Sequence, residues 1–217
     1  MNAALPRPHT DSTEAARPAR YDPPTEPRRK RFSLAEFERL ARDGVLEGRV
    51  ELWDGEIIEM PPTGNAHSVC RSRLNRLFAL AWPPPRFVRA QDTHRFDGGW
   101  APEPDLALLD QEPVDGATVD PLPRLVVEIM QSSADRDLGE KRLRYARAGV
   151  PEYWVADLTR RVVHVFRNPD PTANDADAAW RDLAIAKPDD TVSPLCIPDL
   201  TLTPAEFMPA AGAGPER

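Results

Sequence analysis

The stretch LVVEIM, residues 125–130, is the most apolar strand candidate in the chain. A nearly continuous apolar run of this length is typical of a central β-strand that is buried on both faces. Glu128 interrupts the run, and a carboxylate that is buried without a partner costs several kcal/mol. We therefore expect a metal ion, a basic partner or exposure at the strand end to compensate its charge.

Five further stretches around this run are strand candidates. The segment DLALL covers residues 105–109, and a shorter candidate covers residues 87–90. The β-rich segments EYWVAD (152–157) and RVVHVFR (161–167) are joined by a short turn, which predicts an antiparallel pair. Residues 180–186 are a last candidate beyond a polar loop.

Helix and hairpin signals lie between these strands. Ser33 and Glu36 form a capping box ahead of apolar residues at helical spacing. Apolar residues also recur on one helical face between His67 and Trp82, and residues 135–148 are a third helix candidate. Two short runs on either side of Asp54-Gly55 predict a β-hairpin.

This order of elements predicts an α/β (α+β) fold, with a mixed central β-sheet flanked by helices. The domain is expected over residues 32–209. Residues 1–31 are rich in proline and poor in large apolar residues, which predicts a disordered N-terminal arm. Residues 210–217, which include AAGAGPER, are expected to be a disordered tail.

Charge and cysteine content limit the function classes. A net charge of −7 argues against a protein whose whole surface attracts nucleic acid, but it leaves room for a local basic groove. Cys70 and Cys196 show no CxxC spacing, so we expect neither a disulfide scaffold nor a structural zinc site. The chain shows neither a signal peptide nor an apolar run of membrane-spanning length, so we expect a cytoplasmic protein without a membrane span.

Asp105 raises the same question as Glu128, because it stands at the start of an apolar strand candidate. If the two strands are neighbours, the two carboxylates can converge on one cation. Hard cations such as Mg²⁺ prefer carboxylate oxygens. Two carboxylates and a phosphate oxygen are what metal-assisted phosphodiester cleavage needs.

These residues also carry a family resemblance. Pro104-Asp105 followed by Glu128-Ile129-Met130 resembles the PD-(D/E)XK pattern of the restriction-endonuclease-like superfamily. Four longer strings are similar to the Uma-type restriction endonuclease family, and the similarity covers roughly residues 32–209. The strings are DLGEKRLRY (137–145), GVPEYWVAD (149–157), ELWDGEIIEMPP (51–62) and GNAH (64–67).

The resemblance implies a restriction-endonuclease-like fold and a Mg²⁺-dependent (or Mn²⁺-dependent) endonuclease that cleaves DNA. It implies metal binding by Asp105, Glu128 and the backbone carbonyl of Ile129. Met130 stands where the pattern has its lysine, and in the Uma-type branch Lys141 of the following helix is the matching residue. The stretch MQSSA, residues 130–134, differs from the Ser-Pro-Ser-Thr-like turn of that branch.

Several roles stay open at the level of sequence. Glu51 is either a third acidic metal ligand or an exposed strand residue, and His67 either reaches a phosphate or is structural. Lys141 could also simply pair with Asp137 on a solvated helix face. If Lys141 is catalytic, the variant Lys141→Ala is expected to keep its folding and metal affinity nearly intact and to lose about a hundredfold of nuclease activity or more.

Two predictions concern assembly and the class of function. A homodimer is expected, because a nuclease that cuts both strands of DNA needs two sites. The alternative to a nuclease is a non-catalytic DNA- or protein-binding module on the same fold.

Overall fold

The computed structural model describes residues 25–131 and 136–210. The chain divides into two units, Met1–Lys30 and Arg31–Arg217. In the first unit, residues 25–30 are exposed and contain neither helix nor strand. Most of the expected N-terminal arm and C-terminal tail, and part of the turn after residue 131, lie outside the described residues.

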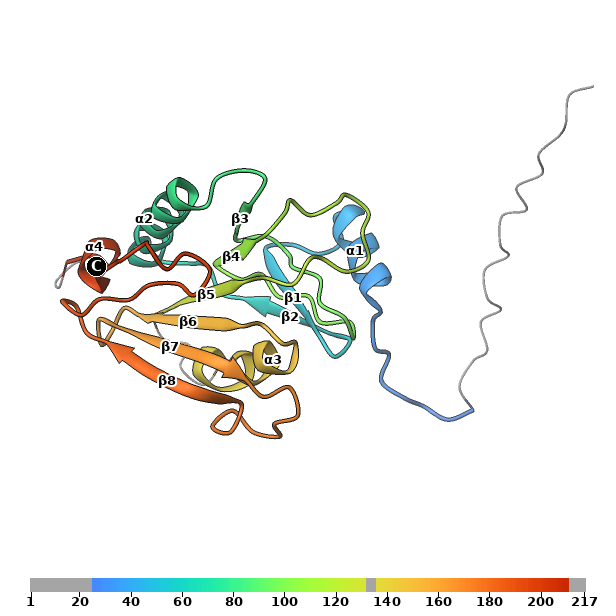
Figure 1. Ribbon diagram of the computed structural model, residues 1–217. Coiled ribbons are helices and arrows are strands. Elements are labelled where there is room, and N and C mark those ends of the chain that lie inside the picture. The colour runs from blue at the N-terminus through green and yellow to red at the C-terminus, as the bar shows by residue number, and fades with distance from the viewer. Residues whose placement is uncertain (1–24, 132–135, 211–217) are drawn as a thin grey trace, which may run out of the picture. The chain divides into compact units, whose positions relative to one another are not determined.

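The second unit is built on a six-stranded sheet in the order β3-β4-β5-β6-β7-β8 (Figure 1). The pair β5 and β6 is parallel, and the other neighbouring pairs are antiparallel. The predicted mixed sheet is therefore confirmed. Its strands are β3 (Phe87–Ala90), β4 (Leu106–Leu109), β5 (Leu125–Met130), β6 (Glu152–Asp157), β7 (Val162–Pro169) and β8 (Trp180–Ala186).

The pairing of β4 with β5 places the two acidic residues of interest side by side. Leu106, the first residue of β4, lies opposite Val127 of β5, and the two strands run antiparallel. Asp105 immediately precedes Leu106, and Glu128 immediately follows Val127. Both carboxylates therefore lie at the same end of the paired strands β4 and β5.

The predicted hairpin is formed by β1 (Arg49–Trp53) and β2 (Glu56–Met60), which pair as a separate two-stranded sheet. Asp54 and Gly55 form its two-residue loop with φ of 50° and 81°. Two consecutive positive φ values match the twist of the flanking strands, which is why Asp-Gly is favoured there.

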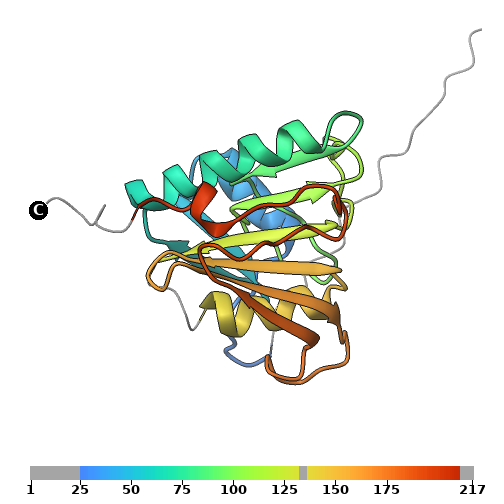
Figure 2. The same cartoon turned by 60° about the vertical axis from the view of Figure 1, so that its left-hand side comes forward.

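Helices cover both faces of the large sheet (Figure 2). The helices are α1 (Leu34–Arg42), α2 (Asn65–Ala81), α3 (Lys141–Arg147) and α4 (Pro204–Phe207). Apolar residues of α2 and α4 pack with Leu125, Val127 and Ile129 in one core. Trp53 of the hairpin and Tyr145 of α3 pack with the opposite face of β5 in a second core.

Two local features differ from the predictions. The third predicted helix opens with a π-helix, Arg136–Glu140, before α3 begins at Lys141. Helix α4 was not predicted, because its four residues are too few to show a helical period. No helix in the described part of the chain is both long and apolar enough to cross a membrane.

Candidate active site

A cavity of about 330 Å³ opens at the end of the β4 and β5 pair where Asp105 and Glu128 lie. Its walls come from the end of the hairpin, the start of α2, the edge of β4 and β5, and the π-helix with the start of α3. The lining residues are Arg49, Met60, Pro61, Pro62, Thr63, Gly64, His67, Asp105, Glu128, Ile129, Gln131, Arg136, Asp137 and Lys141.

Asp105 is held by one of its two carboxylate oxygens. Its Oδ2 accepts a 2.8 Å hydrogen bond from the backbone N–H of Ile129 and lies 2.9 Å from Nε2 of His67. Its Oδ1 is buried and has no hydrogen-bond partner among the described residues. An unpartnered buried oxygen is costly, so this atom is a candidate ligand for a cation.

Glu128 is also held by one oxygen. Its Oε1 accepts hydrogen bonds from Lys141 Nζ and from the hydroxyl of Tyr145, both at 2.8 Å. Its Oε2 makes no hydrogen bond with the described residues. Burial raises the pKa of Glu128 to about 8, and the nearby carboxylate of Asp105 adds to this rise against the opposing charge of Lys141.

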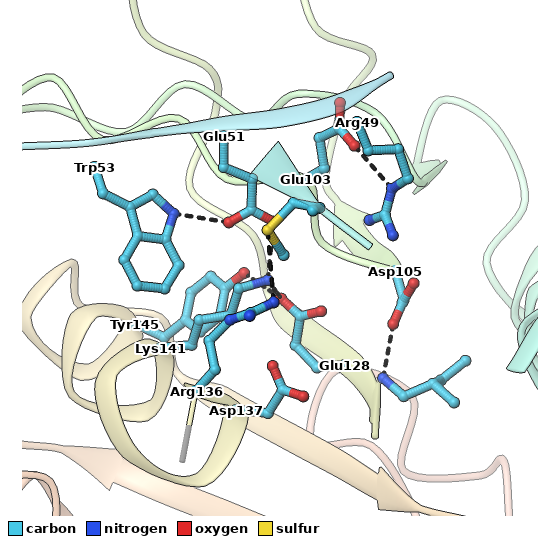
Figure 3. A network of polar contacts seen from close by, with 12 residues as sticks. Arg49, Glu51, Trp53, Glu103, Asp105, Glu128, Arg136, Asp137, Lys141 and Tyr145 are labelled. Carbon is cyan, nitrogen blue, oxygen red and sulfur yellow. Dashed lines mark hydrogen bonds and ion pairs between the residues drawn. The ribbon is translucent and has the colours of Figure 1, made fainter. Parts of the chain in front are cut away.

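Lys141 lies between two carboxylates in the interior (Figure 3). Its Nζ is 2.8 Å from Glu128 Oε1 and 3.1 Å from Glu51 Oε1, and the side chain is 2% exposed. Burial acts to lower the pKa of Lys141, but Glu128 and Glu51 outweigh it and hold the pKa above its ordinary value. This burial excludes the alternative of a lysine on a solvated helix face, and it contradicts the expectation that Lys141→Ala would leave folding nearly intact.

Glu51 lies behind Lys141. It is fully buried and is not among the residues that line the cavity. Its Oε2 accepts a 2.7 Å hydrogen bond from Trp53 Nε1, and its Oε1 accepts the bond from Lys141. Because both oxygens are already engaged, Glu51 contacts the lysine and does not face the cavity as a ligand would.

His67 lines the cavity at the start of α2, where it contacts Asp105. Its Nε2 faces Asp105 Oδ2, and its Nδ1 is buried without a hydrogen-bond partner in residues 25–131 and 136–210. In this arrangement, His67 can orient the carboxylate of Asp105.

Three further residues of the site were not among the predicted site residues. Asp137 and Arg136 line the cavity from the π-helix. The hydroxyl of Tyr145 donates a hydrogen bond to Glu128. Asp137, Lys141 and Tyr145 recur at a spacing of four residues, and this period was the signal that could have linked them.

The donor set can be tested against a divalent cation. Within the described part of the chain, no three His, Cys, Asp or Glu side chains are arranged as ligands of one metal ion. Two carboxylates supplemented by a backbone carbonyl and waters nevertheless suit Mg²⁺, which keeps several waters when it binds protein. The carbonyl of Ile129 lies on the side of β5 from which its N–H reaches Asp105, because both groups of a strand residue point the same way.

A comparison with solved structures identifies a protein of similar architecture. A crystal structure described as a putative nuclease belonging to DUF820, from Anabaena variabilis, matches this fold with a TM-score of 0.62. The sequence identity is 19%, over 81% of this chain and 97% of that chain. At this identity the likeness shows the fold.

The family follows from the sequence model. The model described as "Uma2: Putative restriction endonuclease" matches residues 34–205. The chain therefore belongs to the Uma2 family, and the resemblance seen in the sequence is confirmed.

Two other comparisons add little. The type IIG restriction endonuclease BpuSI matches with a TM-score of 0.37 and 15% identity, over 64% of this chain and 16% of that one. No curated protein sequence matches the chain.

Proposed function

We propose that this chain is a metal-dependent endonuclease that hydrolyses phosphodiester bonds in DNA, with Mg²⁺ or Mn²⁺ as its cofactor. The observation that carries this proposal is the buried Oδ1 of Asp105, which has no partner in the part of the chain that the structure describes and lies next to Glu128 and Lys141. Membership of a restriction endonuclease family supports the reaction class.

Asp105, Glu128 and the carbonyl of Ile129 are the groups that would hold the ion. A divalent cation at this place supplies charge neutralisation on a phosphate oxygen and a lowered pKa for a bound water. Binding would draw on the two carboxylate oxygens that make no hydrogen bond within the described residues, so it would leave the bonds to His67 and Tyr145 in place.

Lys141 supplies the fixed positive charge beside these carboxylates. Glu51 and Glu128 hold its ammonium group from two directions, so it needs little reorganisation to orient a water or to stabilise charge that develops on the phosphate. The hydroxyl of Tyr145 fixes Glu128 from the same helix.

Arg136 is the side chain in the cavity wall that we propose for phosphate binding. Its Nη1 donates to the thioether sulfur of Met60 at 3.6 Å, and this is its one hydrogen bond within the described residues. A thioether is a weak acceptor, so the guanidinium retains donors that match a phosphate. We propose structural support of Asp105 for His67 instead of a direct phosphate contact.

The test is conversion of supercoiled plasmid DNA to nicked and linear forms by the full chain. We expect cleavage with Mg²⁺ or Mn²⁺, none with EDTA, and none by Asp105→Asn. Asp110→Asn is a matched control, because Asp110 follows the other end of β4, is half exposed and pairs with Arg124. Cleavage that persists in EDTA or in Asp105→Asn would refute the proposal.

A non-catalytic DNA- or protein-binding module is the second candidate. It is favoured by Met130, which lies in the apolar core and brings no charge to the site. Such a module would leave plasmid DNA uncut at every metal concentration. The contact of Lys141 with Glu128 supports the nuclease instead, because it restores the missing cation from another element.

We also propose a homodimer and a cytoplasmic location. Strand β8 is an edge of the sheet, and Leu183 and Ile185 on it are 58% and 52% exposed. An exposed apolar edge strand can pair with a second copy. A single monomeric species in light scattering at all accessible concentrations would refute the dimer. Cys70 and Cys196 are free thiols, which fits a reducing compartment.

A further inference from the structure

Helix α2 has an unusual charge for a protein with a net charge of −7. Its sequence, NAHSVCRSRLNRLFALA, contains three arginines and no acidic residue. Cys70, Leu74 and Phe78 bury one side of the helix against the sheet. Arg73 and Arg76 are exposed, and Arg71 is partly exposed.

The partners of these arginines are uncharged. Arg71 donates to the side-chain oxygen of Gln91, and Arg73 donates to the carbonyl of Met208 at 3.1 Å. Arg76 makes neither a hydrogen bond nor an ion pair within the described residues. By contrast, Arg144 and Arg167 elsewhere in the domain are each paired with a carboxylate.

A fourth arginine extends this surface. Arg161 donates to the carbonyl of Pro209, the residue that follows the carbonyl partner of Arg73. Arg161 therefore lies near Arg73, and it too makes no ion pair with the described residues. We call Arg71, Arg73, Arg76 and Arg161 the arginine surface. Figure 2 shows the helix that carries three of them lying beside α4.

The arginine surface adjoins the cavity at two points. Arg71 is one helical turn after His67, which lines the cavity and contacts Asp105. On the other side, Thr159 precedes Arg161 by two residues, and its hydroxyl donates a 2.8 Å hydrogen bond to the carbonyl of Gln131 in the cavity wall. The cavity wall is therefore adjacent to Arg71 on one side and to the segment that carries Arg161 on the other.

We propose that the arginine surface binds the sugar-phosphate backbone of DNA on one side of the bond that is cut. This inference rests on the proposed function for the position of that bond. An arginine carries five N–H donors, so one bond to a carbonyl or amide oxygen leaves donors for a phosphate. Contacts of this kind fix the position of the duplex and do not read its sequence.

The test measures how a short fluorescein-labelled duplex binds to the full chain. Binding is monitored by fluorescence anisotropy, and EDTA is present so that no cleavage occurs. The triple variant Arg71→Ala, Arg73→Ala, Arg76→Ala is compared with Arg39→Ala, Arg42→Ala, Arg181→Ala. The control removes three arginines that are exposed and make no ion pair with the described residues, on α1 and β8, so the net charge changes equally.

The expected result is a change in salt dependence. Between about 50 and 200 mM salt, the slope of log K against log salt should weaken by about 0.9 for each phosphate contact removed. The control should keep the wild-type slope, and duplexes of unrelated sequence should behave alike. Arg76→Ala alone removes no hydrogen bond within the described residues, so this substitution should not disturb folding. It should weaken the slope of log K against log salt by about 0.9.

Two results would overturn the inference: equal slopes for the two triple variants, or a wild-type chain that does not bind the duplex. Its failure is distinguishable from failure of the nuclease proposal. A chain that binds DNA through α2 and never cuts it refutes the nuclease alone. A chain that cuts DNA while the α2 triple variant binds as the control does refutes the arginine surface alone.

Discussion

The ammonium group of Lys141 lies 2.8 Å from Oε1 of Glu128, although the two side chains come from a helix and a strand. Met130, two residues after Glu128 on β5, packs in the apolar core. The positive charge that an E-x-K strand would carry is therefore delivered from α3. The length and flexibility of a lysine side chain allow this exchange between neighbouring elements.

Lys141→Met tests both the catalytic and the structural role of Lys141. Loss of one preorganised charge is expected to reduce DNA cleavage by about a hundredfold or more. Because Lys141 is buried between two carboxylates, the variant should also lose roughly 3–5 kcal/mol of unfolding free energy in denaturant titration. The exposed Lys187→Met is the control and should change neither quantity. Wild-type cleavage by Lys141→Met would show that Lys141 has no catalytic role.

Glu51→Gln tests the role of the carboxylate behind Lys141. The variant keeps an acceptor for Trp53 but removes one of the two charges that hold the lysine. We expect kcat to fall by about 10- to 100-fold, as is typical when a group that orients a site residue is changed. Mn²⁺ affinity, measured by calorimetry, should stay at the wild-type level. If Mn²⁺ affinity is lost as well, Glu51 is a metal ligand.

The buried His94, which lies away from the cavity, should make the free energy of unfolding depend on pH. Burial lowers its pKa to about 4, and Arg89 and Arg95 add to the effect while Asp120 opposes it. A histidine whose pKa is lowered by folding stabilises the protein above its unfolded value of 6.5, and this contribution is lost as the pH falls toward 4.

The loss between these pH values should reach roughly 3 kcal/mol, at 1.36 kcal/mol for each unit of pKa shift. Denaturant titrations at several pH values measure it. His94→Gln keeps an acceptor for Arg89 and should show a shallower decline than the wild type. Equal declines in the two proteins would mean that His94 does not take up the proton.

Much of the fold was predictable because its signals are local. The strands at residues 125–130, 152–157 and 180–186 have the predicted bounds. The clearest signal was the apolar, β-branched run LVVEIM at residues 125–130. Asp54-Gly55 likewise predicted the hairpin from two residues alone. Asp105 and Glu128 were expected to converge only if their strands were neighbours, and the pairing of β4 with β5 meets that condition.

The rest of the site depends on long-range contacts. Lys141 contacts Glu51, which is 90 positions away in the sequence, and sequence periodicity does not indicate such a contact. The burial of Lys141 could not be foreseen either, because the spacing of Asp137, Lys141 and Tyr145 also fits an exposed stripe. The π-helix at Arg136–Glu140 has no sequence signature, yet it brings Asp137 to the cavity.

The central claim is that Asp105 and Glu128 hold one divalent cation, and titration of the full chain with Mn²⁺ by calorimetry tests it most directly. The wild type should bind one Mn²⁺ per chain, and Asp110→Asn should bind it equally well. Asp105→Asn and Glu128→Gln should each lose that binding while they remain folded. Wild-type Mn²⁺ affinity in either of the last two variants, or no binding by the wild type, would contradict the claim.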